Sequence, residues 1–386
     1  MTAAAIYLDH NATTPVDDAV LAEMWPYFSD QCGNASSPHL FGQAARAAVE
    51  SARERVAMLV GVRVRDVVFT SGATEANNLA IRGVVEGAAT ERRQIVSCAT
   101  EHPSVLAPLE ILAKAGLRVD LCSVDAGGVP DMDELLSLCT AQTLLVSVMA
   151  ANNETGTLAP LREIGQIARN VGAIFHTDAT QMVGKLPISM SDVGAQLLSL
   201  SAHKFCGPKG VGALIVDRRV PLAPLLAGGG QERGLRSGTV NVAGCVGAGA
   251  AAQLAAETVS DEAPRLARLR DLLERRLGEV VPGTRVNGQR TQRLPNTLNM
   301  SFAGADAEAI MANMPRVAVS SGSACSTAVP EPSHVLLAMG LSAEDASSAL
   351  RFSLGARTNE QHVAIAVDEV HRAVDAVRRR TGELAK

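Results

Sequence analysis

Length, composition and charge place the chain among ordinary globular proteins and exclude several functions. At 386 residues and 40.1 kDa it exceeds the length at which one hydrophobic core stops growing, so we expect two domains. A net charge of -5 gives no electrostatic reason to expect a nucleic acid or an anionic membrane as partner. The N-terminus becomes polar too soon for a signal peptide, and no apolar run predicts a membrane span. The seven cysteines lack CxxC pairs and metal-ligand spacing, which predicts reduced thiols, a cytoplasmic location and no metal site.

Strands and helices alternate through the first part of the chain. Apolar residues recur at helical spacing from Phe41 to Leu59, and Gly61 ends this predicted helix. Short apolar runs then predict buried strands at 67–70, 94–98, 117–122, 143–149, 173–178, 197–202 and 210–216. Helices are expected to begin near Ala73, Pro103, Asp131 and Pro160. This alternation favours an α/β fold with a mostly parallel sheet covered on both faces, which binds its ligands at the carboxyl ends of the strands.

The pattern changes at about Val240. An Ala/Gly-rich helix leads into a long amphipathic stretch at 257–281, and later segments include the apolar runs 296–302 and 350–354 and a closing helix from about Asn359. These segments predict a smaller α+β domain. We therefore expect a large α/β domain at 16–255 and a small domain formed by 1–15 and 256–386.

Lys204 is an unusual lysine, because it directly follows the buried run 197–202 and precedes a Gly-Pro-Lys-Gly turn at 207–210. Burial lowers the pKa of a lysine and makes its amine a usable nucleophile, as Schiff-base chemistry requires. The alternative is a lysine whose stem is buried and whose amine reaches solvent.

Two strand-to-helix junctions carry polar residues suited to ligand binding. Ser71–Glu75 opens a helix, where backbone N–H groups form an anion site, or where Ser71 or Thr74 forms an ordinary N-cap with Glu75. The chain has no G-x-G-x-x-G fingerprint with an acidic residue placed to read a ribose here, which argues against a dinucleotide. His102 at the next junction is placed to shuttle protons, or is a solvated loop histidine.

Two further strand ends carry amides and a carboxylate. Asn152 and Asn153 follow a predicted strand, where their amides either bind ligand oxygens or close a turn. Asp178 ends the next strand and is expected near the interior, where an unpaired carboxylate is costly. A pyridinium nitrogen would be a suitable partner for it, and a helix N-cap is the alternative.

The joint order of these features is more specific than any one of them. The chain resembles the class V aminotransferase family of pyridoxal-phosphate enzymes of fold type I, and within it the cysteine desulfurases of the NifS/IscS kind. The matching segments are YLDHNATTPV (7–16), GNASSPH (33–39), FTSGATEANNLAI (69–81), TEH (100–102), NNETG (152–156), DATQ (178–181), SAHKFCGPKGVGAL (201–214), GGGQERGLRSGTVN (228–241), SSGSACS (320–326) and LRFSLG (350–355). They cover nearly the whole chain, and the resemblance implies a seven-stranded, mostly parallel sheet in the large domain.

The resemblance also implies a role for each matching residue. Lys204 would hold pyridoxal phosphate covalently, Asp178 would pair with the pyridine nitrogen, and Gln181 would bind the phenolic oxygen. His102 would stack on the ring and act as an acid or base. The other expected cofactor contacts are Ala73, Thr74, Asn153, Ser201, His203 and, from a second subunit of a homodimer, Thr239.

The substrate-binding residues implied by the resemblance are Asn153 and Arg351. Arg351 would grip the carboxylate of the amino acid with two hydrogen bonds, and a surface ion pair is the alternative.

Cys325 selects the reaction that we expect. It lies in a Ser/Gly/Ala loop that belongs to the small domain and is followed by Pro330 and Pro332, a setting that favours an exposed nucleophile over a small packed side chain. The SSGSAC match then implies a cysteine desulfurase, in which Cys325 takes the sulfur of L-cysteine as a persulfide and L-alanine is released. The other six cysteines are expected to be structural, with Cys206 the closest in sequence to Lys204.

The physiological sulfur acceptor stays open at this point. The persulfide would pass to a protein acceptor, either a scaffold for iron–sulfur clusters or a thiolation enzyme. The alternative within the fold is a selenocysteine lyase or another class V lyase. A nicotinamide oxidoreductase would need the missing glycine fingerprint, and a non-catalytic sulfur carrier would leave Lys204, Asp178 and His102 without a purpose.

Overall fold

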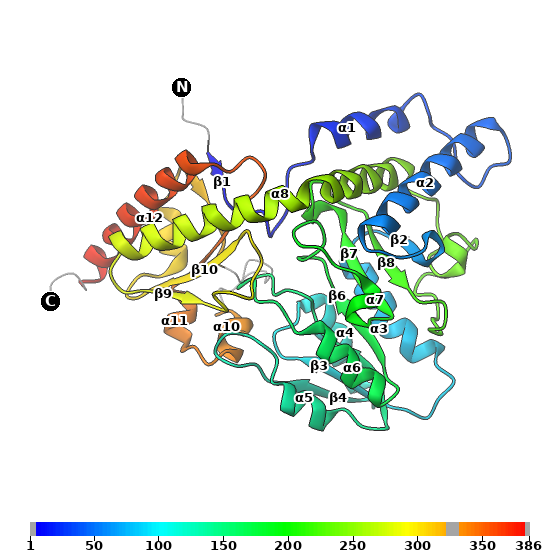
Figure 1. Cartoon of the computed structure of the whole chain (residues 1–386), viewed down its shortest axis with the longest axis horizontal. Coiled ribbons are helices and arrows are strands. Elements are labelled where there is room, and N and C mark those ends of the chain that lie inside the picture. Colours follow the sequence, from blue (N-terminus) through cyan, green and yellow to red (C-terminus); the bar gives the residue numbers. More distant parts are fainter. Residues whose placement is uncertain (1–4, 322–331, 383–386) are drawn as a thin grey trace.

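The computed structural model describes residues 5–321 and 332–382, and it contains two groups of elements joined by one long helix (Figure 1). Within the described residues, the larger group of elements is built on a sheet of seven strands. Its order is β2 (Val67–Thr70), β8 (Gly212–Val216), β7 (Leu197–Ser201), β6 (Ile174–Asp178), β5 (Thr143–Ser147), β3 (Gln94–Cys98) and β4 (Arg118–Cys122). Only β8 runs antiparallel to its neighbours, so the predicted mostly parallel sheet is confirmed.

Helices cover both faces of this sheet, as the buried strand sequences require. One face packs on α3 (Ala73–Gly87) and α4 (Pro103–Lys114). The other packs on α2 (Leu40–Leu59), α6 (Leu161–Asn170) and the start of α8 (Val242–Val280). Neighbouring strand residues point to opposite faces, so that Leu197 packs with α3 and Leu198 packs with α2.

The remaining elements of the large group are short. They are α1 (Asp18–Met24), η1 (Trp25–Phe28), η2 (Val64–Asp66), α5 (Met132–Leu138), α7 (Met190–Val193), η3 (Ala202–Lys204) and η4 (Glu232–Gly234). The predicted helix starts are reproduced, because Pro103 is the first residue of α4, while Asp131 and Pro160 cap α5 and α6.

The smaller group has its own sheet and its own apolar cluster. The sheet is antiparallel in the order β12 (Ala349–Ser353), β10 (Thr297–Phe302) and β9 (Thr284–Asn287). The other elements here are β1 (Ile6–Tyr7), α9 (Ala307–Ala312), β11 (Val317–Ala318), α10 (His334–Ala338), α11 (Ala343–Ser347) and α12 (Glu360–Thr381). Ile6 and Leu8 pack in this cluster, so the N-terminal strand joins the C-terminal part of the fold.

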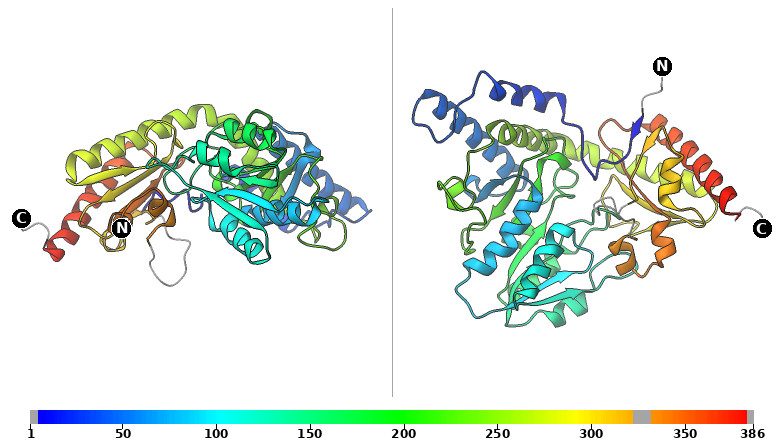
Figure 2. Two further views of the ribbon diagram at one scale, coloured as in Figure 1. Left: turned by 90° about the horizontal axis from the view of Figure 1, so that it is seen from below. Right: turned by 180° about the vertical axis from the view of Figure 1, so that it is seen from behind.

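Helix α8 connects the two groups, and both views of Figure 2 show it extending from one to the other. Its Ala/Gly-rich start lies close against α2, because a Cβ at Gly249 would stand only 2.5 Å from Cα of Ala52. Its second half turns Leu266, Leu273 and Leu277 into the smaller cluster. The predicted Ala/Gly helix and amphipathic stretch are thus one helix of 39 residues, with Pro264 inside it.

A segment of α8 is long and apolar enough, by length and composition alone, to cross a bilayer, with a mean hydropathy of 1.3. Because 67% of that segment is buried inside the molecule, its apolar composition reflects packing in the protein interior.

Candidate active site

A cavity of about 560 Å³ lies at the carboxyl ends of β2, β3, β5, β6 and β7. Ten of the residues predicted from the sequence line it: Ala73, Thr74, His102, Asn153, Asp178, Gln181, Ser201, His203, Lys204 and Arg351. The strand ends supply most of them, and Arg351 comes from β12 of the smaller group. The N-terminal residues Asn11, Ala12 and Thr13 complete the wall. The cavity is therefore built by both groups of elements.

Lys204 lies in η3, directly after β7, and its amine is held in the cavity wall. Nζ donates hydrogen bonds to the carbonyl oxygens of Asn11 (2.5 Å) and Ala12 (2.8 Å). The side chain is only partly exposed and lines the cavity, so the alternative of an amine that reaches bulk solvent does not describe this lysine. An amine here is available to a ligand with an electrophilic carbon.

Asp178 is buried at the end of β6, where it accepts hydrogen bonds from two neutral donors. Asn77 Nδ2 lies 2.7 Å from Oδ2, and the backbone N–H of Thr180 lies 2.9 Å from Oδ1. Residues 180–185 form a turn, so Asp178 is not the N-cap of a helix. The hydroxyl of Thr180 is buried, has no hydrogen-bond partner among residues 5–321 and 332–382, and lines the same cavity. This wall therefore has polar capacity left for a ligand.

The turn before α3 leaves the start of that helix open. The N-cap is Gly72, with φ of 152°, a backbone conformation that residues with a side chain rarely adopt. No described side chain caps the helix, and the Glu75 carboxylate instead accepts from the backbone N–H of Ser71 (2.8 Å) and from Arg236 Nε (2.9 Å). The alternative of an ordinary Ser/Thr N-cap is therefore excluded. The first N–H groups of α3 remain suited to an anion such as a phosphate.

His102 is the N-cap of α4, and its ring is fixed by Ser104. Its Nδ1 accepts from the backbone N–H of Ser104 at 3.1 Å, so the neutral ring carries its proton on Nε2. Burial lowers the pKa of His102, which keeps the imidazole neutral at neutral pH. Asn77 links this histidine to Asp178, because its Nδ2 also donates to Ser104 Oγ at 2.8 Å.

The other histidine of the cavity, His203, stands beside Lys204. Burial and then the charge of Lys204 lower the pKa of His203 to about 4. Its Nδ1 lies 3.1 Å from Thr13 Oγ1. His203 is therefore a neutral hydrogen-bonding group at neutral pH, placed by the N-terminal segment.

Arg351 is buried rather than paired on the surface, and only 4% of it is exposed. Its Nη2 donates to Asp9 Oδ1 at 2.7 Å, and its Nη1 donates to the carbonyl oxygen of Asn153 at 3.1 Å. Its Nε is buried without a hydrogen-bond partner in the described ranges. Such a guanidinium retains capacity for a carboxylate ligand.

The sequence left open whether Asn152 and Asn153 close a turn or face a ligand, and the structure shows one of each. Asn152 closes a turn, because its Oδ1 accepts from the backbone N–H groups of Glu154 (2.9 Å) and Thr155 (3.0 Å). Asn153 lines the cavity.

Two predicted site residues do not lie in this cavity. Thr239 is exposed and does not line it, so any contact with a cofactor phosphate would have to be made in another copy of the chain. Cys325 lies outside the residues that the structure describes.

The expectation for the remaining cysteines holds only in part. Cys98, Cys122, Cys139 and Cys245 are buried, and burial raises the pKa of each thiol to between about 11 and about 12. Cys206 is partly buried, and burial raises its pKa as well. Cys32 is exposed, so it is not a packed structural residue.

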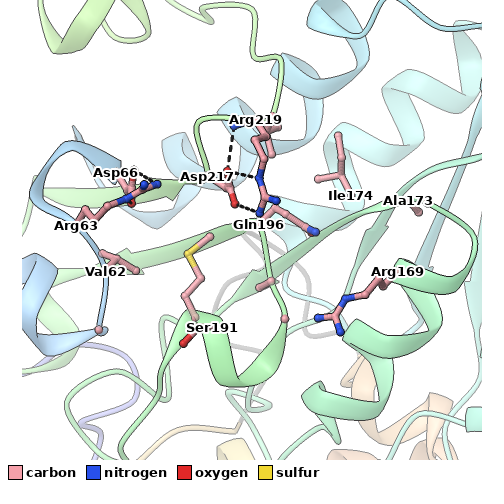
Figure 3. A pocket seen from close by; sticks show the side chains of 16 residues that line it. Val62, Arg63, Asp66, Arg169, Ala173, Ile174, Ser191, Gln196, Asp217 and Arg219 are labelled. Carbon is pink, nitrogen blue, oxygen red and sulfur yellow. Dashed lines mark hydrogen bonds and ion pairs between the residues drawn. The ribbon is translucent and has the colours of Figure 1, made fainter.

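A second cavity, of about 960 Å³, lies at the opposite ends of the strands, near the starts of β6 and β7 (Figure 3). Its charged side chains are largely paired with one another. Arg63 Nε lies 2.8 Å from Asp66 Oδ2, and Arg219 Nη2 lies 2.6 Å from Asp217 Oδ2. The first cavity is the better candidate for an active site, because it combines Lys204, His102 and Asp178 at the carboxyl ends of parallel strands.

Sequence reasoning missed four polar residues that fix this site: Asn11, Asn77, Ser104 and Lys185. Asn77 offered one signal, since it stands among the apolar residues on the buried face of α3. The others gave none, because nothing in the neighbouring sequence marks a polar residue that is buried by distant segments.

The fold and the cavity define a pyridoxal-phosphate-dependent enzyme of fold type I. A model of the family described as "Aminotransferase class-V" matches residues 6–365, and the chain belongs to this family. It is 48% identical over 361 residues to "Cysteine desulfurase IscS" of Anaeromyxobacter sp. (strain Fw109-5), an alignment that covers 93% of this chain and 89% of the relative.

Solved structures agree with this assignment. A NifS-like protein superposes with a TM-score of 0.90 at 37% identity, covering 96% of this chain and 99% of that one. A structure described as "SspA in complex with cysteine" superposes with a TM-score of 0.80 at 34% identity, covering 90% of this chain and 98% of that one. The predicted family, fold and cofactor are therefore confirmed.

Proposed function

We propose that this chain is a cysteine desulfurase that uses pyridoxal phosphate to move the sulfur of L-cysteine onto Cys325, with release of L-alanine. The observation that carries the proposal is the meeting of Lys204, Asp178, His102 and Arg351 around one cavity. The names of the relatives favour this reaction over the selenocysteine lyase alternative.

The residues of the cavity fit the cofactor. Asp178 offers a buried carboxylate to a ring nitrogen, the uncapped start of α3 offers N–H groups to a phosphate, and Lys204 offers an amine to the aldehyde. When bound, pyridoxal phosphate supplies an electron sink for bonds broken at Cα of an amino acid. The further contacts we propose are Thr74, Ser201 and His203 for the phosphate, with Ala73 contributing its backbone. Asn153 and Gln181 would contact the ring.

We assign two proton-transfer groups and one substrate anchor. Nζ of Lys204 takes the proton from Cα of the substrate, and His102, whose proton is on Nε2, is the second group, positioned to donate a proton from that atom. Arg351, supported by Asn153, binds the substrate carboxylate.

The sulfur transfer itself is a nucleophilic displacement by Cys325. The thiolate sulfur bonds to the substrate sulfur, the bond from that sulfur to Cβ breaks, and its electron pair stays with carbon, which is then protonated. The products are L-alanine and a Cys325 persulfide. This persulfide passes to a protein acceptor, either an iron–sulfur scaffold or a thiolation enzyme, in the cytoplasm.

We also propose that the enzyme is a homodimer in which Thr239 reaches the phosphate of the partner subunit. The exposure of Thr239 outside its own cavity supports this arrangement. Large apolar side chains are exposed near the N-terminus on α1, η1 and α2, which supports an interface there. They are Leu21, Trp25, Phe28, Leu40 and Phe41.

Two separate apolar clusters support a division into domains. We propose a large domain at 16–255 and a small domain at 1–15 and 256–386, with the boundary inside α8. Leu266 and the residues after it pack with the small cluster, while Ala255 still packs with the large one. The cavity then lies where the two domains meet.

The Cys325→Ser variant tests the function. We expect it to bind pyridoxal phosphate like the parent and to lose sulfide and alanine production from L-cysteine, because serine cannot accept the sulfur. The Cys32→Ser variant removes an exposed thiol elsewhere and serves as the matched control. Parental sulfide release by Cys325→Ser under a thiol reductant would contradict the proposal.

A further inference from the structure

Lys185 is a buried lysine behind the active-site cavity. It is the last residue of the turn after β6, and its side chain is almost fully enclosed. Its Nζ donates to Gln181 Oε1 at 2.7 Å and to Asn11 Oδ1 at 3.0 Å. Neither acceptor carries a charge. Within the described ranges, no carboxylate forms an ion pair with this lysine. A buried lysine in such a place is costly, which calls for a role beyond packing.

The two contacts of Lys185 determine which way the amide of Gln181 faces. The charged form of lysine has three N–H donors and no acceptor, so Gln181 presents its amide oxygen to Nζ. The other end agrees, because Gln181 Nε2 lies 2.9 Å from the carbonyl oxygen of Asn11, which can only accept. The NH₂ group of Gln181 therefore faces the cavity that Gln181 lines. One of its two hydrogens bonds to Asn11, and the other remains for a ligand.

The same lysine supports Asn11, and Asn11 supports Lys204. The Asn11 side chain is set by Lys185 at Oδ1 and by its own donation to Thr297 Oγ1 at 2.9 Å. Its carbonyl oxygen accepts from Lys204 Nζ. The amine of Lys185 therefore holds two residues, Gln181 and Asn11, that contact the reacting region.

We propose that Lys185 is a positioning residue that acts through Gln181, holding its NH₂ group as the hydrogen-bond donor to the phenolic oxygen of the cofactor. This inference rests on the proposed function, because it uses the place of pyridoxal phosphate in the cavity. A donor at that oxygen stabilises its anionic form and lowers the pH at which the bound cofactor changes its visible absorption.

The charged and titratable groups around Lys185 do not take over its role of holding the Gln181 amide. Lys204, Arg351, His10 and Cys206 face it from the surrounding segments. Burial, and then the charges of Lys204 and Arg351, lower the pKa of Lys185 well below its usual value. The Lys185 amine has enough N–H groups to donate to both amide oxygens whether or not it is charged, so these two contacts do not depend on its charge.

The test is a pH titration of the visible absorption of the bound cofactor in the Lys185→Met variant. We expect the variant to bind pyridoxal phosphate and the titration midpoint to rise by about one pH unit or more, since the Gln181 amide is no longer held. The Lys209→Met variant removes a lysine at the exposed rim of the same cavity. We expect it to shift the midpoint much less. An unchanged midpoint in Lys185→Met would overturn the proposal.

A double-mutant cycle with Gln181→Met separates positioning from a direct effect of charge. If Lys185 acts through Gln181, then Lys185→Met causes little further shift once Gln181 is already methionine. A full additional shift in the double variant would show that Lys185 acts on the cofactor directly, and this also overturns the proposal.

The Gln181→Glu variant keeps the inference testable where Lys185→Met fails to fold. A carboxylate here can still accept from Lys185 but has no N–H to donate to the phenolic oxygen, so we expect a raised midpoint. An unchanged midpoint in Gln181→Glu would mean that this side chain is not the donor to that oxygen, and this also overturns the proposal. A parent protein that binds no pyridoxal phosphate would instead refute the proposed function, so the two failures are distinguishable.

Discussion

The side-chain amide of Asn77 donates a hydrogen bond of 2.7 Å to Oδ2 of Asp178, and neither residue is more than 7% exposed. Asn77 lies on α3, whose first turn forms the open anion site, while Asp178 ends β6. One hydrogen bond therefore fixes the proposed partner of the cofactor ring relative to the proposed phosphate site.

Replacing Asn77 should weaken cofactor retention. A hydrogen bond to a charged group contributes about 1.5–3 kcal/mol, so we expect Asn77→Ala to bind pyridoxal phosphate about 10- to 100-fold more weakly. Cofactor content after dialysis, read from visible absorbance, measures the effect. The matched control is Asn78→Ala, since Asn78 donates only to the Thr74 carbonyl oxygen on an exposed side of the helix. Equal retention by both variants would contradict the role given to Asn77.

The contact of Arg351 with Asp9 should control substrate affinity. Asp9 holds Nη2 at 2.7 Å, and the charge-assisted hydrogen bond orients the guanidinium. We expect Arg351→Ala to raise the KM for L-cysteine by about 10- to 100-fold and Asp9→Asn to raise it less. Steady-state alanine production measures KM and kcat for both variants. The exposed Arg357→Ala variant is the control, and a changed kcat with an unchanged KM in Arg351→Ala would contradict a role in substrate binding.

His102 should be needed for turnover but not for folding. Removing a positioned acid or base typically costs about 10²- to 10⁴-fold in rate, so we expect a fall of this size in kcat for His102→Gln. Because burial lowers the pKa of His102 below 6.5, any loss of activity caused by its protonation should lie on the acid side of that value. The pH profile of kcat/KM in the parent tests this point. If the loss of kcat/KM caused by protonation of His102 had its midpoint above pH 6.5, the lowered pKa of His102 would be contradicted.

Glu154 should make stability depend on pH. It is buried, and burial raises its pKa from 4.5 to about 7, while Ser333 Oγ lies 2.5 Å from Oε2. Since the folded-state pKa is above the unfolded value, the stabilisation by this group is complete below about pH 4.5 and is lost as the pH rises through about 7. The loss amounts to about 3 kcal/mol, because each pKa unit corresponds to about 1.4 kcal/mol.

The Glu154→Gln variant tests this dependence, because the amide resembles the protonated acid and cannot ionise. We expect its melting temperature to exceed that of the parent at pH 8 and to approach it at pH 5. Parallel curves for the two proteins across this range would show that Glu154 does not carry the effect.

The sequence alone determined the fold class and the chemistry that the chain carries. Buried strands such as 197–201 are short segments rich in apolar residues, and helices such as α4 begin at capping residues, so both can be recognised from the local sequence. Parallel strands also bring their carboxyl ends to one edge, which is why Asp178, Lys204 and His102 could be placed together in advance.

Only the tertiary structure decided how those groups are held. Asn77 and Asp178 are 101 positions apart, Lys204 and Asn11 are 193 apart, and Arg351 and Asp9 are 342 apart. The first contact depends on how α3 packs on the large sheet, and the other two depend on how the N-terminal segment and the smaller group pack beside that sheet. Local sequence patterns reflect the conformation of neighbouring residues, whereas the orientation of an amide or the desolvation of a lysine is set by atoms that the chain brings together only when it folds.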